Sequence, residues 1–320
     1  MEDLFMRVTI TDIAREAEVS NATVSRYLTK NGYVSQEAAT KIQTAIDQLG
    51  YTYREHHNQF TSRAIEVNFP NIDNPFYAEL FEELSTYLKQ KGYDCILHLD
   101  HFQLQDFDYF QERFQNQEIA GLITSSLLNI SKRSLNRNYP IVSFDRRISP
   151  KIPTIQSNNL DAGIQIAQYV LSHGKNNILL LAGAREDLYP INDRIKGMMR
   201  VFNNYHTQIT TEALNASDSI VAQKIAIQQF LKRNTYDAIC CTDDITALLA
   251  KQCTDDLHLA PLITGFDGTY LIQNLFPKLV TVRQNTKAIA EVLSDILLRR
   301  IKYPLYPLEP IYTLPVNLIH

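Results

Sequence analysis

The segment Thr9–Leu28 constrains the fold of this chain more than any other, because its pattern is typical of two short helices joined by a tight turn. Thr9 suits the N-cap of the first helix, and Asp12 stands three residues later, as in a capping box. Three apolar residues of that helix recur at helical spacing, namely Ile13, Ala14 and Ala17. The stretch therefore begins with one short amphipathic helix that has a defined start.

The turn and the second helix follow directly. Glu18–Ser20 forms the expected turn, and Val19, its only apolar residue, is expected to fill the angle between the helices. Ser20 suits the N-cap of the second helix. The inward positions of that helix are Val24, Tyr27 and Leu28. Together the two helices form a predicted helix-turn-helix unit.

The outward face of the second helix carries short side chains and one arginine near the helix N-terminus, namely Asn21, Ala22, Thr23, Ser25 and Arg26. This chemistry suits a helix that enters the major groove of DNA, because amides and hydroxyls bind phosphate while Asn21 and Arg26 reach base edges. The alternative is an ordinary surface helix of a three-helix module. The position of the unit ahead of a much larger domain favours DNA binding.

A third helix is expected between Ser35, which suits its N-cap, and Gly50, which suits its end. Its inward stripe is Ala39, Ile42, Ile46 and Leu49. With this helix, the run from Val8 to Tyr51 resembles the headpiece of the lactose and galactose repressor (LacI/GalR) family. The residues that carry the resemblance are Asp12-Ile13-Ala14, Val19-Ser20, Thr23-Val24-Ser25-Arg26, Val34-Ser35 and Leu49-Gly50-Tyr51.

The resemblance implies which residues of the headpiece contact DNA. Asn21 and Ala22 would select operator bases, and Arg26 would be the general base-contacting arginine. The DNA-contacting set that we expect is Thr9, Ser20, Asn21, Ala22, Thr23, Ser25, Arg26, Tyr51 and Phe60. Residues 1–57 are thus expected to form a DNA-binding headpiece.

The segment Thr52–Arg63 is expected to connect the headpiece to the larger domain, with residues 58–63 as the hinge or linker proper. In the resembling family, this region becomes a short hinge helix on operator DNA and inserts a leucine into the minor groove. Here the family's usual residues are replaced by Tyr53, Arg54, His57-Asn58 and Phe60. Phe60 still offers an apolar wedge. The alternative is a plain polar linker with no structure of its own.

From Ala64 onward, short β-rich runs alternate with amphipathic helices. Strands are expected over Ile65–Phe69, Tyr93–Leu99, Ile119–Thr124, Ile141–Phe144, Ile178–Leu181, Ala238–Cys241, Leu262–Phe266, Leu279–Val282 and Thr313–Leu318. Helices are expected over Phe76–Lys91, Phe107–Gln115, Asp161–His173, Asp193–Asn204, Ser219–Arg233, Asp244–Cys253 and Thr286–Ile301. This alternation is typical of an α/β fold with parallel sheets covered by helices on both faces.

The length of residues 64–320 suits two such doubly wound sheets, with a seam near Gln156–Asn159. We expect a two-lobed effector domain. Lobe 1 would comprise residues 64–157 and 284–303, and lobe 2 residues 158–283 and 304–320. In open parallel sheets, ligands bind beyond the carboxyl ends of the strands.

Carboxylates stand directly after three of the predicted strands, at Asp145, Asp243 and Asp267. Carboxylates accept hydrogen bonds and Arg194 donates them, so together they suit the hydroxyls of a sugar. Phe76 or Tyr77 offers an aromatic face for its ring. The alternative for each aspartate is a helix cap or a turn residue.

These positions also match the effector domain of the LacI/GalR family, which resembles a periplasmic sugar-binding protein. The matching residues are Asn74-Pro75-Phe76-Tyr77, Asp145-Arg146, Arg194 with Gly197, Asp243-Asp244 with Ala247, and Gly265-Phe266-Asp267. Ser125 falls where the family often has a polar effector contact. The resemblance thus implies an effector-binding set of Phe76, Tyr77, Ser125, Asp145, Arg194, Asp243 and Asp267.

The charge of the chain argues against a protein that coats nucleic acid, because the formal net charge is −4. Residues 1–63 hold seven Lys and Arg against eight Asp and Glu, so the headpiece is not basic either. Neutralisation of phosphate supplies much of the affinity for DNA. A headpiece of this charge is therefore expected to gain affinity by acting as one half of a homodimer.

Several other functions are not favoured. The sequence has no P-loop, no Gly-x-Ser-x-Gly elbow and no His-Glu-x-x-His zinc helix, so neither an enzyme nor a cofactor is expected. The one metal-like cluster contains His98 and His101, whereas a metal site needs three or four converging ligands. No apolar run is long enough to span a membrane, and the acidic N-terminus is not a secretory signal.

We therefore expect a transcription regulator that represses a carbohydrate operon and is controlled by a small sugar. The four cysteines suit reduced thiols of a cytoplasmic protein. The few basic residues near the expected cleft favour a neutral sugar over a sugar phosphate. Two alternatives remain: a sugar-binding sensor with weak or no DNA binding, and a sugar transport protein, which would need a secretory signal and no headpiece.

Overall fold

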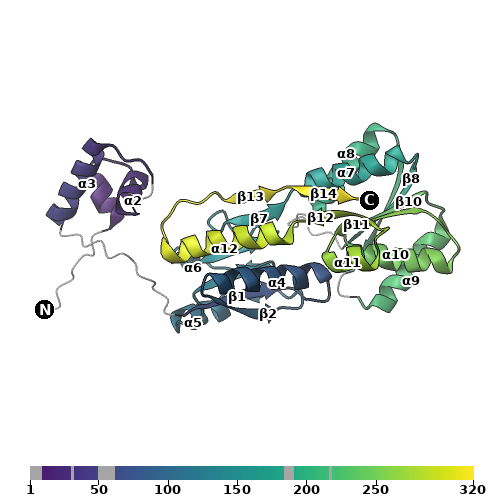
Figure 1. Ribbon diagram of the computed structural model, residues 1–320, viewed down its shortest axis with the longest axis horizontal. Coiled ribbons are helices and arrows are strands. Elements are labelled where there is room, and N and C mark those ends of the chain that lie inside the picture. Colours follow the sequence, from purple (N-terminus) through teal and green to yellow (C-terminus); the bar gives the residue numbers. More distant parts are fainter. Residues whose placement is uncertain (1–8, 30–31, 50–61, 184–190, 216–217) are drawn as a thin grey trace.

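The computed structural model describes residues 9–29, 32–49, 62–183, 191–215 and 218–320, and Figure 1 shows a small helical headpiece and a larger body of two α/β lobes. The headpiece consists of α1 (Ile10–Glu16), α2 (Asn21–Thr29) and α3 (Gln36–Leu49). Ile13, Val24 and Ile42, one from each helix, are fully buried in its core. The predicted helix-turn-helix unit with a third supporting helix is confirmed.

The helix starts of the headpiece are those that the sequence predicts. Thr9 and Asp12 form the capping box, with each side chain accepting from the backbone N–H of the other. The Oγ atoms of Ser20 and Ser35 accept hydrogen bonds from backbone N–H groups in the first turns of α2 and α3. Glu18 has a φ of 54°, the left-handed conformation that lets the turn reverse the chain within a few residues.

Lobe 1 is built on a six-stranded parallel sheet in the order β13-β7-β6-β4-β1-β2. Its strands are β1 (Ala64–Phe69), β2 (Asp94–Leu99), β4 (Gly121–Thr124), β6 (Ile141–Phe144), β7 (Thr154–Ser157) and β13 (Ile311–Leu314). Helices α4 (Pro75–Gln90) and α12 (Thr286–Lys302) pack on one face of the sheet. Helices α5 (Asp108–Gln115) and α6 (Lys132–Leu135) pack on the other, beside a small sheet of β3 (Gln105–Asp106) and β5 (Leu128–Asn129).

Lobe 2 repeats this architecture in the order β14-β12-β11-β10-β8-β9. Its strands are β8 (Asn177–Gly183), β9 (Gln208–Leu214), β10 (Ala238–Cys241), β11 (Leu262–Asp267), β12 (Val280–Gln284) and β14 (Val316–Ile319). Helices α7 (Asn159–Ser172) and α8 (Ile191–Asn204) cover one face. Helices α9 (Ile220–Arg233) and α10 (Asp244–Asp256) cover the other, and α11 (Tyr270–Leu275) joins β11 to β12.

The chain passes between the lobes at three places: after β7, after β12 and after β13. The seam predicted near Gln156–Asn159 is the first of these. Because the strands of each sheet run parallel, apart from β14, their carboxyl ends gather at one edge, from which the crossing segments leave. The fold is therefore the predicted two-lobed doubly wound α/β domain.

The C-terminal segment differs from the prediction. The sequence suggested one closing strand over Thr313–Leu318 in lobe 2, but Pro315 divides the segment into β13 and β14. Proline has no N–H for a strand ladder, so the run breaks there. β13 pairs with β7 in lobe 1, and β14 pairs antiparallel with β12 in lobe 2. Residues 304–314, expected in lobe 2, thus contribute a strand to lobe 1.

Four strands and two helices were not predicted, namely β3, β5, β7 and β9, with α6 and α11. β7 and β9 contain alternating polar residues, such as Thr210, Thr211 and Glu212 of β9, which weaken the apolar signal of a strand. β9 lies at the edge of its sheet, where one side of the strand needs no partner. α11 is only six residues long, which is too short for an apolar periodicity to be read. Within the described residues, no helix has the length and apolar character required to cross a bilayer.

Candidate functional site

The outer face of α2 presents the residues that the sequence assigned to base reading. Asn21, Ala22 and Arg26 are exposed, whereas Val24 is buried against α1 and α3. The Asn21 amide donates to the Thr11 hydroxyl at 3.3 Å. On the inner side, the Tyr27 hydroxyl donates to Gln43 of α3 at 2.7 Å. The helix is thus held on one side and open on the other.

One residue of the expected DNA-contacting set is not on the open face. Ser25 is only 9% exposed, although the sequence placed it outward. It lines a groove with Asn21 and Ala22 on one side, and with Leu305 and Pro307 of the α12–β13 connection on the other. The expected contacts Tyr51 and Phe60, and the altered hinge positions Tyr53, Arg54, His57 and Asn58, lie outside the described residues.

Arg194 is at the centre of the candidate effector site, where the two lobes meet. It is 6% exposed, lies in the first turns of α8, and reaches carboxylates of both lobes. Its Nη2 lies 4.0 Å from Asp145 of lobe 1, and its Nη1 lies 3.9 Å from Asp267 of lobe 2. The guanidinium carbon stands 3.4 Å from the centroid of the Phe266 ring, which adds a cation–π contact. The sequence-predicted arginine and two of the three aspartates therefore come together.

Asp145 directly follows β6, Asp267 is the last residue of β11, and both have unusual backbone conformations. Asp145 has a φ of 53° and Asp267 a φ of 108°, in the region that side chains rarely adopt. Such strain is concentrated at binding sites, because the surrounding structure has to hold it in place. Among the described residues, no hydrogen bond of normal geometry reaches Oδ1 of Asp145 or Oγ1 of the neighbouring Thr242, and both atoms are buried. Buried polar atoms usually have partners, so these two oxygens are candidate contacts for a polar ligand.

Burial also changes the protonation of these carboxylates. It raises the pKa of Asp145 to about 6, although the nearby Arg194 and Arg146 oppose the rise. It raises the pKa of Asp267 to about 7, again against the opposing effect of Arg194. Near neutral pH the site therefore carries less negative charge than a count of its carboxylates suggests.

Three side chains that hold the site in place were not in the predicted set, namely Asn159, Gln284 and Asn74. Asn159 accepts from Arg194 Nε at 2.6 Å, and the Thr242 carbonyl accepts from Nη1 at 2.7 Å. Gln284 donates to Asp267 Oδ1 at 2.8 Å and accepts from Ser157, so it joins two of the crossing segments to the site. The only sequence signal for Asn159 was its place at the predicted seam, and Gln284 had none.

Asn74 is the third of these residues, and it links the lobes directly. Its Oδ1 caps α4 by accepting from the Phe76 N–H at 2.9 Å. Its Nδ2 donates to Oδ2 of Asp267 at 3.3 Å. One side chain thus starts a helix of lobe 1 and contacts the strand-end carboxylate of lobe 2.

The adjacent Asp243 and Asp244 have structural partners. Asp243 is the N-cap of α10, and its two oxygens accept from the backbone and hydroxyl of Thr246, both at 2.7 Å. This is the helix-cap alternative raised by the sequence. Asp244 accepts from the Thr281 hydroxyl and the Gly268 N–H. Burial, reinforced by Asp267, raises the pKa of Asp244 to about 8, so it holds the β11–α11 turn largely in its protonated form.

The aromatic residues divide between core and site. Phe76 is 4% exposed and stacks on Phe144, with ring centroids 5.5 Å apart, so it belongs to the core of lobe 1. The Tyr77 hydroxyl lies 3.3 Å from Ser125 Oγ, and the Ser125 carbonyl accepts from Arg146 at 3.1 Å. Burial raises the pKa of Tyr77. Tyr77, rather than Phe76, is placed to offer a ring to a ligand.

Within the part of the chain that the structure describes, no cluster of three or more His, Cys, Asp or Glu side chains could hold a metal ion. His98 belongs to the one metal-like cluster in the sequence. Its Nδ1 lies 3.6 Å from Oε1 of the buried Glu66, and its ring packs on that of Tyr109. The chemistry available at the lobe junction is hydrogen bonding to a polar ligand.

Comparisons with known proteins match both parts of the chain. The family model described as "Bacterial regulatory proteins, lacI family" matches residues 9–53. The model described as "Periplasmic binding protein domain" matches residues 65–298. The chain is 32% identical to the sucrose operon repressor of Streptococcus mutans serotype c over 97% of each chain. It is 30% identical to the ribose operon repressor of Halalkalibacterium halodurans, covering 97% of this chain and 95% of that relative.

Solved structures share the fold. A LacI family transcriptional regulator from Enterococcus faecium with bound ribose gives a TM-score of 0.69 at 20% identity, covering 80% of this chain and 97% of that one. The Lac repressor dimer bound to operator gives a TM-score of 0.65 at 20% identity over 98% of each chain. The second match extends the likeness across headpiece and body together.

Proposed function

Because the chain belongs to the LacI family of bacterial regulatory proteins, we propose that it represses a carbohydrate-use operon and that a small sugar bound between its lobes controls the repression. The observation that carries this proposal is the position of Arg194, which reaches Asp145 of one lobe and Asp267 of the other. A polyol that bonded to both carboxylates would favour one arrangement of the lobes over another.

The mechanism is a linkage between two binding sites. Two headpieces of a homodimer must meet half-sites about one helical turn of DNA apart, or multiples of it. A change in the lobe arrangement changes the spacing of the headpieces and so the operator affinity. The coupling free energy expected for such a system is about 1–3 kcal/mol. This function places the protein in the cytoplasm, with operator DNA, a sugar and a second copy of itself as partners.

The charges at the site favour a neutral sugar. Asp145 and Asp267 both face Arg194, and Arg194 is already bonded to Asn159 and to the Thr242 carbonyl. A phosphate dianion needs donors that are not already occupied. Hydroxyls instead satisfy carboxylates and arginine at once, since they both donate and accept.

A thermal-shift screen tests the sugar. The names of the relatives suggest sucrose and D-ribose as probes. D-fructose is added because it is one of the two sugars of sucrose, and D-ribose 5-phosphate and D-fructose 6-phosphate serve for comparison. At one hundred times its Kd, a ligand stabilises the folded state by about 2.7 kcal/mol. We expect a neutral sugar to raise the melting temperature and the phosphates to leave it unchanged. A shift produced only by a phosphate ester would overturn the choice of a neutral sugar.

A DNA-binding experiment tests the other half of the function. Operator sequences are selected from a random duplex library with the full chain and then measured by gel shift, with and without the sugar. Enrichment of an inverted repeat, and weaker binding when the inducing sugar is added, are the expected results. Absence of any enriched sequence would favour the sugar sensor without DNA binding.

A further inference from the structure

Glu79 of α4 joins the two lobes beside the candidate site. Its side chain is 17% exposed and accepts two short hydrogen bonds. Oε2 accepts from the backbone N–H of Tyr270 at 2.6 Å, and Oε1 accepts from the Thr286 hydroxyl at 2.7 Å. Arg283 Nη2 lies 4.0 Å from Oε1. Tyr270 and Arg283 belong to lobe 2, whereas Glu79 and Thr286 belong to lobe 1.

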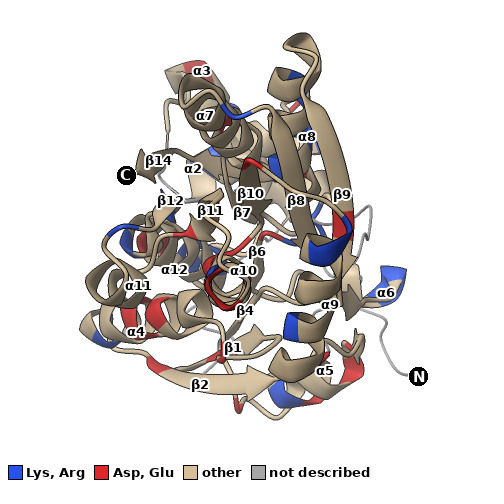
Figure 2. Ribbon diagram, turned by 90° about the vertical axis from the view of Figure 1, so that its right-hand side faces the viewer, with Lys and Arg blue, Asp and Glu red and all other residues tan. Residues whose placement is uncertain are grey.

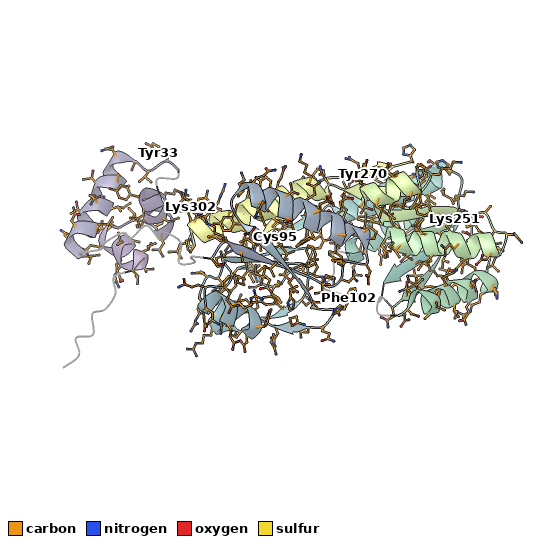
Figure 3. The ribbon with its side chains drawn as sticks, turned by 60° about the horizontal axis from the view of Figure 1, so that its bottom comes forward. Tyr33, Cys95, Phe102, Lys251, Tyr270 and Lys302 are labelled. Atoms are coloured by element: carbon orange, nitrogen blue, oxygen red, sulfur yellow. The ribbon has the colours of Figure 1, made fainter. Side chains whose placement is uncertain are left out.

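The elements that carry these residues lie side by side. α4 and α11 are neighbours in Figure 1 and again in Figure 2, where acidic segments of α4 stand next to α11. Figure 3 labels Tyr270 at the start of α11, on the same side of the body as α4. The contact therefore spans the lobe junction on the side where the chain passes from β12 to α12.

The Tyr270 N–H has few other ways to be satisfied. It is the first residue of α11, and the first N–H groups of a helix have no partner within that helix. The Tyr270 side chain is 68% exposed, so this residue is linked to α4 through its backbone N–H rather than through its ring. A hydrogen bond donated by an N–H to a carboxylate is among the stronger protein hydrogen bonds, because its acceptor is charged.

Glu79 is also connected to the effector carboxylate from two directions. Asn74, the N-cap of the same helix, donates to Asp267 Oδ2. Gln284, two residues before Thr286, donates to Asp267 Oδ1 at 2.8 Å. Asp267 stands three residues before Tyr270. Any separation of α4 from α11 would therefore also pull Asn74 away from Asp267, while Gln284 would stay with Asp267 because β11 and β12 are paired in lobe 2.

We propose that Glu79 is a positioning residue for effector binding. Its hydrogen bonds with Tyr270 and Thr286 form an inter-lobe clasp. This clasp holds the lobes in the arrangement in which Asn74, Arg194 and the two strand-end carboxylates meet. This proposal rests on the proposed function for its sugar, but the clasp itself is a property of the protein alone. Glu79 is not placed to touch the ligand. It acts by fixing the distance between α4 and α11.

Hydrogen–deuterium exchange on the full chain without any sugar tests the clasp. In Glu79→Ala, the Tyr270 amide loses its acceptor, and we expect it to exchange at least tenfold faster than in the parent protein. Glu79→Gln keeps a carbonyl acceptor and should retain most of the protection. Glu82→Ala is the matched control, because Glu82 is an exposed glutamate of the same helix. Unchanged exchange in Glu79→Ala would overturn the clasp.

Calorimetric titration then tests the effect on binding, using whichever of sucrose, D-ribose and D-fructose stabilises the parent protein most. We expect Glu79→Ala to raise the Kd at least fivefold, Glu79→Gln to restore most of the affinity, and Glu82→Ala to have no effect. Faster exchange at Tyr270 with an unchanged Kd would overturn the positioning role. If none of the three sugars binds the parent, that result counts against the proposed sugar function, and the exchange experiment alone decides the clasp.

Discussion

Gly163 of α7 and Gly197 of α8 face each other where the two helices cross, so closely that a Cβ atom on Gly197 would lie 3.1 Å from Gly163 Cα and 2.1 Å from the Leu160 carbonyl oxygen. Arg194 lies one turn before Gly197, and its partner Asn159 lies one turn before Gly163. The close crossing therefore sets how deeply the guanidinium reaches between the lobes.

Replacing Gly197 by alanine should damage both stability and the site. The added methyl group meets backbone atoms that have no room to move, and overpacking of this kind costs about 1–3 kcal/mol. Denaturant unfolding should show a loss of this size, and the sugar-induced thermal shift should shrink, because α8 carries Arg194. Gln168→Ala, an exposed substitution on α7, should change the free energy of unfolding by less than about 0.5 kcal/mol. Equal free energies of unfolding and equal sugar-induced thermal shifts in Gly197→Ala and Gln168→Ala would contradict a role for the close helix crossing.

Asp267→Ala should abolish the response to sugar while leaving DNA binding intact. Asp267 faces Arg194, Asn74 and Gln284 at the lobe junction, far in sequence from the headpiece. The readout is the difference in melting temperature with and without sugar, because the substitution also alters the basal stability. A control on the same lobe is Asp255→Ala, an exposed member of an i,i+4 ion pair with Lys251. Persistence of the shift in Asp267→Ala would remove Asp267 from the ligand contacts.

Arg26→Ala should weaken binding to the selected operator. Arg26 is exposed on α2, and a good base contact is worth about 1–3 kcal/mol, or roughly 5- to 150-fold in affinity. The gel-shift affinity should fall by that amount on operator DNA and change little on random duplex. Gln48→Ala, at an exposed position of α3, serves as the control. An unchanged operator affinity would count against base reading by α2.

The stability of the protein should depend on pH through Glu66. This carboxyl, on β1, has a side chain that is 1% exposed, and burial raises its pKa from 4.5 to about 7 despite the opposing charge of Arg113. A raised carboxyl pKa means that the folded state holds the proton more tightly than the unfolded chain does. The contribution of Glu66 to the free energy of unfolding is therefore fully present below about pH 4.5 and is lost as the pH rises through about 7. The difference in pKa corresponds to at most about 3 kcal/mol.

Glu66→Gln isolates this contribution from the other buried carboxyls, which act in the same direction. The variant should lose less stability than the parent protein between pH 5 and pH 8 in denaturant unfolding. The control is Glu118→Gln, because Glu118 also lies near Arg113 but its side chain is 49% exposed. Parallel pH profiles for the parent and Glu66→Gln would show that the buried carboxyl titrates at an ordinary pKa.

The sequence by itself determined the local features of this protein. The capping box of Thr9 and Asp12, the caps at Ser20 and Ser35, and the alternation of apolar strands with amphipathic helices involve residues a few positions apart. Their chemistry is the same wherever the segment lies. The positions of Asp145 and Asp267 at strand ends were readable for the same reason, since a strand end is a local property. Elements without a strong local signal, such as β9 and the divided C-terminal strand, could not be predicted from the sequence.

Only the tertiary structure decided which polar residues bond to one another and what each one does. Asp243 turned out to cap α10, Phe76 to fill the core of lobe 1, and Ser25 to lie in a groove. Ser157 and Gln284 are 127 positions apart in the chain, and Glu79 and Tyr270 are 191 apart. Contacts over such separations form only when two independently wound sheets are brought together at the crossing segments. The local sequence pattern does not predict these contacts, because each partner by itself is an ordinary polar residue whose hydrogen bonds water would satisfy equally well.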